Sequence, residues 1–168
     1  MRWLILVLAL LVALVVAIFI IGGMLPVNHV ATGSMVIHQP PEVVWHTITD
    51  HANQPKWRPE VQSMVRLPDR NGHEVWQENY KHDHLTFETL ESIPPKKLVR
   101  QIVAEEKAPF TGKWDIALEP VGGGTRVTIT ENGKVGNHFF RFVSKFVIGH
   151  TRTIEVYLKN LAGRFGET

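Results

Sequence analysis

An uninterrupted apolar segment at the N-terminus constrains this chain more than any other feature. From Trp3 to Leu25 there is no charged residue and no proline, and the sequence reads WLILVLALLVALVVAIFIIGGML. At a rise of about 1.5 Å per residue this segment forms roughly 34 Å of helix, enough to cross a hydrocarbon core of about 30 Å. Backbone groups in lipid must bond within their own segment, so we expect a transmembrane helix that ends at Pro26.

The main alternative for this segment is a cleaved secretory signal peptide. A signal peptide has an apolar region of about 7–15 residues, followed by a small-x-small cleavage site. The apolar run here is longer, and the stretch from Pro26 to Ala31 offers no good site of this kind. A lipoprotein is excluded because the chain has no cysteine to lipidate. We therefore favour an uncleaved anchor over residues 1–26.

The charges that flank the apolar run predict its orientation. Arg2 and the amino terminus are positive, whereas the far side carries no charge before Glu42. The positive-inside rule then places the N-terminus in the cytoplasm and the following domain outside the cytoplasmic membrane. This expectation depends on a single arginine. The lack of cysteine fits either compartment, because such a domain needs no disulfide.

The rest of the chain has the length and charge balance of one soluble domain. Residues 34–168 are enough for a hydrophobic core, and residues 27–33 are expected to form a short tether to the apolar segment. The chain has 18 Lys and Arg against 16 Asp and Glu. No basic run or nucleic-acid-binding motif occurs, so nucleic acid is not an expected partner.

Sequence periodicity defines the elements of this domain. A short strand over 34–38 precedes a helix over 42–49 and a second helical turn near Trp57. Alternating residues then predict a series of strands, and Asn71-Gly72 marks a hairpin turn between the first two. A helical stripe with Asn137 as its N-cap predicts one continuous closing helix over 137–164. The predicted strands in this series cover 61–67, 74–81, 85–93, 98–105, 110–119 and 125–135.

This order of elements predicts an α+β fold. Antiparallel strands with helices on one face form a layered sandwich. We expect a curved antiparallel sheet of about six or seven strands, wrapped on a long C-terminal helix, with two short helices after the first strand. A strongly curved sheet around one helix leaves a cavity between the two.

The opening of the domain resembles that of START-like (SRPBCC) domains. The resemblance rests on IHQPPEVVW at 37–45, ITD at 48–50 and PKWRP at 55–59, and the strand after the glycine run at 122–124 is similar too. It covers residues 34–165. The resemblance implies the helix-grip fold with a deep apolar pocket, as in polyketide cyclase/dehydrase-like and lipid-transfer members. Membership of this superfamily does not determine the chemistry.

Strand parity selects candidate residues for such a pocket. Alternate residues of a strand point to one face, so the apolar faces of strands 110–119 and 125–135 should meet the closing helix. On strand 74–81 and just beyond it, Trp76, Tyr80 and His82 fall together. Large rings with a few polar groups are typical of small-molecule sites, although core packing is the simpler explanation for any single ring. The candidate ligand-binding residues are Trp57, Trp76, Tyr80, Phe87, Phe110, Trp114, Ile129, Glu131, Phe139, Phe142 and Phe146.

Glu131 is the most distinctive polar candidate. By parity it lies on the apolar face of its strand, where an unpaired carboxylate is costly. There it would bind a ligand hydroxyl or transfer a proton. The alternative is that a bulge at Asn132-Gly133 turns the side chain to solvent, or that it forms a structural salt bridge. Glu131, Tyr80 and His82 are weak catalytic candidates.

The sequence does not favour a metal, phosphate or nucleophile site. His82 and His84 share a strand face but lack a third ligand, so no metal site is expected. The glycine run at 122–124 precedes a strand and not a helix, which makes it a turn and not a phosphate loop. No G-x-S-x-G motif occurs. We expect no cofactor.

The leading functional hypothesis is membrane-tethered binding or transfer of a hydrophobic small molecule or lipid. One alternative is a cyclase/dehydrase-like enzyme acting on a hydrophobic substrate, which a titratable group with a shifted pKa at the pocket floor would favour. Another is a non-catalytic module that assembles with a protein partner in a membrane complex. A filled cavity together with an exposed apolar patch would favour that module.

Overall fold

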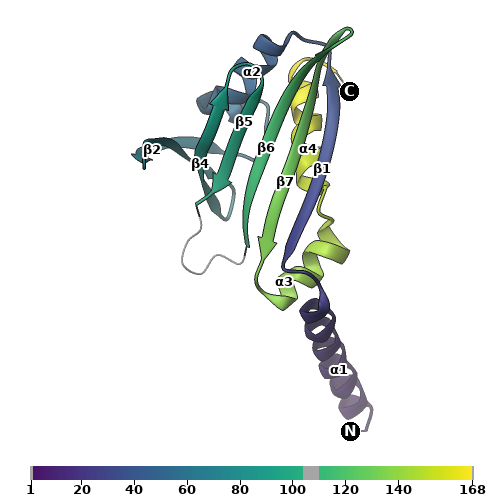
Figure 1. Ribbon diagram of the computed structural model, residues 1–168. Coiled ribbons are helices and arrows are strands. Elements are labelled where there is room, and N and C mark those ends of the chain that lie inside the picture. Colours follow the sequence, from purple (N-terminus) through teal and green to yellow (C-terminus); the bar gives the residue numbers. More distant parts are fainter. Residues whose placement is uncertain (1, 104–109, 168) are drawn as a thin grey trace.

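The computed structural model describes residues 2–103 and 110–167, which form a seven-stranded sheet, its associated helices and a separate N-terminal helix (Figure 1). The predicted strand 98–105 therefore extends beyond the described residues. In chain order the elements are α1 (Arg2–Met24), β1 (Asn28–Ile37), α2 (Pro41–Thr49), η1 (His51–Lys56), β2 (Ser63–Arg70), β3 (His73–Asn79), β4 (His84–Ile93), β5 (Lys97–Ile102), β6 (Phe110–Val121), β7 (Gly124–Val135), α3 (His138–Val143), η2 (Ser144–Ile148) and α4 (Arg152–Arg164).

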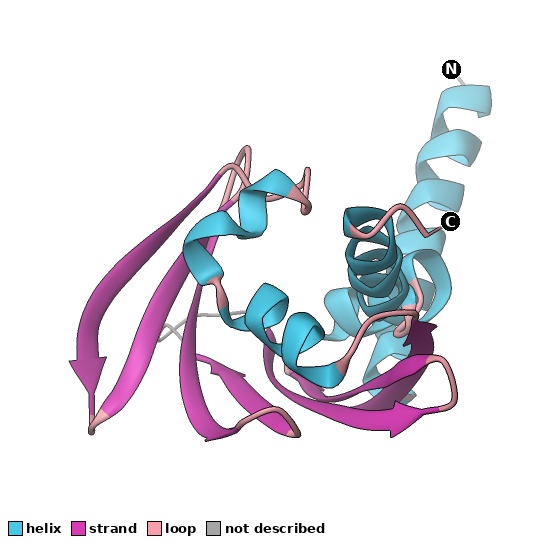
Figure 2. Cartoon of the chain, turned by 90° about the horizontal axis from the view of Figure 1, so that it is seen from above, coloured by secondary structure: helices cyan, strands magenta, loops and turns pink. Residues whose placement is uncertain are grey.

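The sheet is antiparallel throughout, with strand order β1-β7-β6-β5-β4-β3-β2. Seen from above, it curves around the helices, which lie on its concave side (Figure 2). The longest pairing joins β6 to β7, where Trp114 is opposite Glu131 and Ile116 is opposite Ile129. The predicted α+β helix-grip fold is confirmed, including the two short helices after the first strand.

The core forms between the concave face of the sheet and α4. Ile37 of β1, Ile116 of β6 and Ile129 of β7 are at most 1 % exposed, and Ile154 and Leu161 of α4 are fully buried. Burying one such side chain contributes about 1.5–3 kcal/mol. This packing places α4 against β1 and β7. The β3–β5 part of the concave face is contacted instead by Arg58, which follows η1.

Helix α2 follows from its local sequence. Pro41 occupies the first helical turn, where its missing N–H costs nothing, and Val44, Trp45 and Ile48 are buried at helical spacing. Asp50 ends the helix, and η1 follows directly. This pair of short helices carries the chain to Trp57 and Arg58, both of which are buried.

The first strand begins earlier than expected. Residues 27–33 were predicted to be a tether, but β1 starts at Asn28 and pairs with β7 from Asn28↔Lys134 to Ile37↔Thr125. The first residues of this strand have no strong apolar pattern that would predict it. They are held in the sheet by pairing with the long β7. Only Leu25 to Val27 therefore separate α1 from the sheet.

The closing helix is interrupted. The prediction of one helix over 137–164 was wrong in this respect, since the chain forms α3, the π-helical turn η2 and then α4. Gly149 has φ +81°, a left-handed conformation that glycine adopts at little cost and that ends a helix. Asn137 caps α3 as predicted, because its side-chain oxygen accepts hydrogen bonds from the backbone N–H groups of Phe139 and Phe140.

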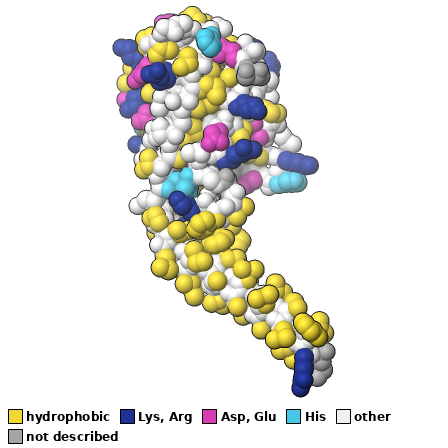
Figure 3. All heavy atoms as spheres, turned by 90° about the vertical axis from the view of Figure 1, so that its right-hand side faces the viewer, with side chains coloured by type: hydrophobic (Ala, Val, Ile, Leu, Met, Phe, Trp, Pro, Cys, Tyr) yellow, Lys and Arg dark blue, Asp and Glu magenta, His cyan; other side chains and the backbone are white. Residues whose placement is uncertain are grey.

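Helix α1 packs its last turns against α3. Gly22 lies so close to α3 that a Cβ there would be 2.0 Å from the carbonyl oxygen of His138. The rings of Phe19 and Phe139 are 6.3 Å apart, and the Arg141 guanidinium donates to the carbonyl of Leu25 at 2.7 Å. Most of α1 is otherwise exposed, and its surface is almost wholly apolar (Figure 3).

The close approach at Gly22 predicts a difference between two neighbouring alanine substitutions. Gly22→Ala should separate α1 from α3 at a cost of about 1–3 kcal/mol, because the new methyl group meets backbone that cannot yield. Gly23→Ala should have little effect, since its Cβ meets only the movable His138 side chain at 3.3 Å. Hydrogen exchange of the α3 amides checks this, and equal exchange in the two variants would contradict it.

Candidate functional site

A cavity of about 400 Å³ lies between the sheet and the segment α3–η2–α4. This volume falls in the usual range of small-molecule sites. Its lining comes from β1, from β3 through β7 and from the helical segment. The interrupted closing helix is important here, because α3 and η2 cover the cavity where α4 does not extend.

Most of the cavity wall is apolar. Phe87 of β4 and Ile102 of β5 lie on one side, and Val135 of β7 lies on another. Phe110 and Phe140 also line the cavity, yet they are 39 % and 44 % exposed. Phe110 and α3 thus form an exposed end of the cavity lining, and α3 is in contact with α1.

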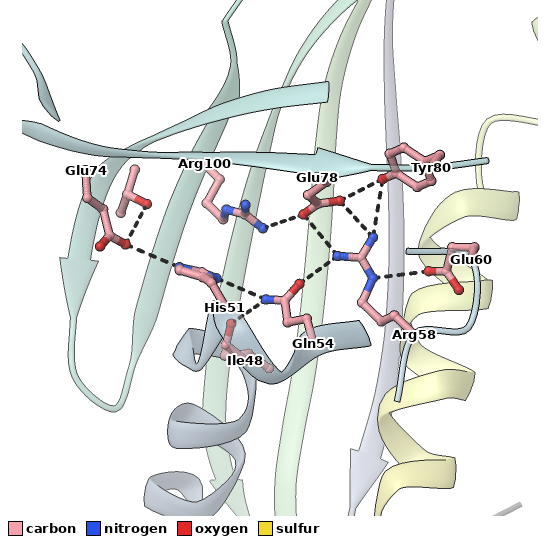
Figure 4. A network of polar contacts seen from close by, with 10 residues as sticks. Ile48, His51, Gln54, Arg58, Glu60, Glu74, Glu78, Tyr80 and Arg100 are labelled. Carbon is pink, nitrogen blue, oxygen red and sulfur yellow. Dashed lines mark hydrogen bonds and ion pairs between the residues drawn. The ribbon is translucent and has the colours of Figure 1, made fainter. Parts of the chain in front are cut away.

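Two arginines and a glutamate form the polar floor of the cavity (Figure 4). Glu78 of β3 is 1 % exposed and accepts two hydrogen bonds from the Arg58 guanidinium, each 3.0 Å long. Arg100 of β5 donates from Nη1 to the same carboxylate at 3.2 Å, and the Tyr80 hydroxyl donates to it at 2.7 Å. We call Arg58, Glu78 and Arg100 the floor cluster.

The floor cluster keeps Glu78 ionised despite its burial. Burial alone would raise the pKa of this carboxyl, but the charges of Arg100 and Arg58 and the hydrogen bonds outweigh it and lower the pKa to about 2. Tyr80 responds in the opposite sense, because burial and the adjacent Glu78 charge raise the pKa of its hydroxyl. Both groups therefore keep one protonation state across the physiological pH range.

Contacts with three neighbouring side chains hold the Arg58 guanidinium at the cavity. Gln54 of η1 accepts from its Nη1 at 2.7 Å, and Glu60 accepts from its Nε at 3.1 Å. The guanidinium also lies over the ring of Tyr157 of α4, 5.3 Å from the centroid. One arginine thus links η1, β3 and α4 at the cavity floor.

The polar network continues from Gln54 to a buried histidine. His51 is bonded through Nδ1 to the Gln54 amide at 3.0 Å and through Nε2 to Glu74 at 3.2 Å. Burial lowers the pKa of His51 below its usual value of 6.5, although Glu74 opposes this shift. The hydrogen bond from His51 lowers the pKa of Glu74 to about 2. This part of the network anchors η1 to β3 and does not line the cavity.

A second polar group lies on the β1–β7 side of the cavity. Glu131 accepts a 2.7 Å hydrogen bond from the Trp114 indole and pairs with His29 at 3.2 Å. The His29 ring stacks on His150 at a centroid distance of 4.1 Å. Burial, together with the charges of His29 and Lys145, lowers the pKa of His150. Both carboxylate oxygens of Glu131 are thus engaged by neighbouring side chains.

The structure brings four of the predicted ligand-binding residues to the cavity. Phe87, Phe110, Trp114 and Glu131 all line it. Glu131 points inward, and no bulge turns it to solvent, since β6 and β7 pair in regular register through this region. The structural ion pair given as the other alternative does form, with His29. Contact of these four residues with a ligand stays a prediction.

The other predicted residues lie elsewhere. Trp57 and Ile129 are core residues, and the Trp57 ring packs edge-on against Tyr157. Trp76 lies beside His51, Tyr80 contacts Glu78 from beyond the end of β3, and His82 is exposed after it. Phe139 faces α1, while Phe142 and Phe146 pack against each other at 5.0 Å. None of these residues lines the cavity within the described part of the chain.

Sequence reasoning missed six ionisable residues that line the cavity. One signal was available, because Glu78 shares its strand parity with Trp76 and Tyr80 and lies between them. A charged residue in that position suggests a buried partner. No comparable signal pointed to the others. The six residues are Arg58, Glu78, Arg100, His29, His150 and Tyr157.

Within residues 2–103 and 110–167, no cluster of three or more His, Asp or Glu side chains is arranged to hold a metal ion. Glu131 lies beside the stacked His29 and His150 rings, but these three side chains do not form such a cluster. The floor cluster offers hydrogen bonding and ion pairing, and the Glu131 group offers a carboxylate and two imidazoles, within a mostly apolar wall.

Comparison with known families gives a match over nearly the whole domain. Residues 28–166 match the family model described as "Polyketide cyclase / dehydrase and lipid transport". No curated protein matches the sequence significantly. The matched region begins at the first residue of β1, in agreement with the observed start of the sheet.

Several solved structures share the fold at low sequence identity. The di-domain aromatase/cyclase StfQ of the steffimycin biosynthetic pathway matches with a TM-score of 0.67 and 9 % identity, over 83 % of this chain and 52 % of that protein. This chain thus corresponds to about half of StfQ. The Zhui aromatase/cyclase from a Streptomyces species matches with a TM-score of 0.66 and 11 % identity, over 82 % of this chain and 93 % of its own. A protein from Thermus thermophilus matches with a TM-score of 0.64 and 19 % identity, over 81 % and 96 %.

The buried charge of Glu78 predicts an acid-sensitive contribution to stability. Its folded pKa of about 2 lies below the ordinary value of 4.5, so its contribution is full above about pH 4.5 and is lost as the pH falls toward 2. Glu78→Gln should lower the free energy of unfolding by about 3–5 kcal/mol at pH 7, because two buried guanidinium groups lose their counter-charge.

Urea unfolding of this variant and the wild type at pH 7 and pH 3 measures both effects. The difference between the two proteins should shrink at the lower pH. Glu119→Gln is the matched control, since this carboxylate is 66 % exposed and only 4.0 Å from Arg126 at its nearest. A Glu78→Gln variant as stable as the control at pH 7 would show that the floor cluster does not stabilise the fold.

Proposed function

Because the chain belongs to the polyketide cyclase/dehydrase and lipid transport family, we propose that its cavity binds or transfers a hydrophobic small molecule or lipid beside a membrane. Membership supports a hydrophobic-ligand or cyclase-type role, and the shared fold is that of aromatase/cyclases. The proposal for this chain is narrower than the family description. It combines the cavity with the apolar helix α1.

The observation that carries the proposal is the apolar lining of the cavity together with the position of its exposed aromatic rings. Most of the wall surface is apolar, and Phe110 and Phe140 at the α3 end are 39 % and 44 % exposed. Phe140 belongs to α3, the helix that packs against the last turns of α1. An apolar ligand that leaves a bilayer next to α1 therefore has a short path to the cavity.

The membrane part of the proposal rests on α1. This helix of 23 residues is long and apolar enough to cross a bilayer. We propose that residues 1–26 anchor the chain in the cytoplasmic membrane, with the N-terminus inside and the domain outside, because Arg2 is the only charged side chain flanking the helix on its N-terminal side. The chain from β1 onward then forms the ligand-binding domain, which uses no cofactor.

Filling the cavity should abolish ligand retention without unfolding the domain. Gly112 lines the cavity on the same face of β6 as Phe110 and Trp114, and a Cβ there meets no atom closer than 3.6 Å. Gly112→Phe should therefore place a ring in the space that a ligand occupies. Native mass spectrometry of the full chain, purified from membranes in mild detergent, should show a bound molecule on the wild type and much less on the variant.

Gly122→Phe is the matched control for this experiment. Gly122 lies in the exposed turn between β6 and β7, and nothing is within 4 Å of its Cβ position. The control should retain as much bound molecule as the wild type. A wild type that carries no molecule and takes up none from lipid vesicles would defeat the proposed function.

The orientation is tested separately from ligand binding. Protease added to intact spheroplasts that express the full chain should digest the domain, because we place it outside the cytoplasmic membrane. Lysed spheroplasts serve as the positive control for cleavage. Complete protection of the domain in intact spheroplasts, with digestion after lysis, would show the opposite orientation.

A further inference from the structure

Arg100 of the floor cluster has two hydrogen-bond donors without a partner among the described residues. Its side chain lines the cavity and is 7 % exposed, and only Nη1 donates, to Glu78. Nε and Nη2 are buried and bond to no protein atom in the described part of the chain. A buried charged donor without an acceptor is costly, so the position calls for an acceptor that the described part of the chain does not provide.

Glu78 cannot supply that acceptor, because its carboxylate is already fully used. It receives two hydrogen bonds from Arg58, one from Tyr80 and one from Arg100. Glu60 bonds to Arg58 Nε, Glu74 bonds to His51, and neither carboxylate lines the cavity (Figure 4). Arg58 therefore has two acidic partners, Glu60 and Glu78. Arg100 bonds only to Oε1 of Glu78, an oxygen that also accepts from Arg58.

The two unpartnered donors have a specific geometry. In a planar guanidinium, the Nε–H bond and one bond of Nη2 point in parallel along the same edge. This edge matches the two oxygens of a carboxylate, which it binds through two parallel hydrogen bonds. The unused part of Arg100 is thus a complete carboxylate-binding edge and not a pair of unrelated atoms.

The guanidinium itself packs on an apolar group. Its face lies over the ring of Phe87, 4.6 Å from the centroid, and Leu85 and Ile102 line the same cavity. A ligand that fits both features has one acidic head and an apolar body. Water would satisfy the donors as well, but it would leave the apolar wall without a partner.

We propose that Arg100 binds the carboxylate of a long-chain carboxylic acid whose apolar chain occupies the cavity. This inference rests on the proposed function and specifies its ligand class. A planar two-oxygen head uses both donors at once, whereas an alcohol uses only one. A phosphate head carries further oxygens, and these would face Phe87 and the aliphatic wall without a donor.

Paired ligands of equal chain length test the inference. The full chain, delipidated in detergent, is titrated with palmitate, hexadecanol and hexadecyl phosphate at pH 8 by displacement of a fluorescent fatty-acid probe. Palmitate should bind at least about tenfold more tightly than hexadecanol, the size of one charge-assisted bidentate contact. Arg100→Met should remove most of that preference and still bind hexadecanol, which shows that the cavity is intact.

Two further variants complete the design. Arg100→Lys keeps the charge but lacks the two-donor edge, so its preference for palmitate should fall between those of the wild type and Arg100→Met. Arg126→Met is the matched control, because Arg126 is exposed on β7 away from the cavity, and it should behave as the wild type.

Several outcomes would overturn the inference. Equal binding of palmitate and hexadecanol by the wild type would show that no acid is recognised, and the proposed function would stand. An unchanged preference in Arg100→Met would show that another group recognises the acid. Tighter binding of hexadecyl phosphate than of palmitate would assign the edge to a phosphate. If neither palmitate nor hexadecanol binds, and native mass spectrometry detects no bound molecule, the proposed function fails with it.

Discussion

A carboxylate that is 1 % exposed is stable only if the groups around it replace its hydration, and the arrangement of this fold on the β3–β5 side follows from that requirement at Glu78. Its partners come from separate parts of the chain, namely Arg58 after η1, Arg100 on β5 and Tyr80 beyond β3. Together they hold η1 against the concave face of the sheet, beside Tyr157 of α4. An apolar replacement of similar volume would serve stability equally well, so the charges are better explained by the cavity that they line.

The sheet was predictable where the strand pattern is regular. On β6 and β7, alternation alone placed Trp114 and Glu131 on the inner face, and the two are directly paired. The floor cluster was not predictable in the same way. A glutamate in a strand is usually exposed, and the partners that bury Glu78 are 20 and 22 positions away in the sequence, so only the folded chain shows their proximity. Parity on β3 gave the one available hint.

The two errors in element boundaries have different physical origins. The closing helix was predicted as continuous because its apolar stripe continues past Gly149, yet one left-handed residue is enough to end a helix and redirect the chain. The start of β1 at Asn28 was missed because its first residues are stabilised by pairing with β7 and have no strong apolar pattern of their own. The helix break is local to Gly149, whereas at the start of β1 a tertiary pairing outweighs the weak local preference. The interruption creates α3, and with it the part of the cavity wall that faces α1.

The positions of the polar and apolar ends of the cavity bear on how a ligand would lie in it. Arg100 pairs across β5–β6 with Trp114, and Phe110 lies four residues further along β6 toward α3. With an acidic head at Arg100, an apolar chain would extend along this strand toward Phe110 and Phe140. That end of the cavity lies at α3, which packs closely against α1 at Gly22. On the proposed function, an acid leaving the bilayer beside α1 would enter with its head first, and its chain would remain nearest the lipid throughout.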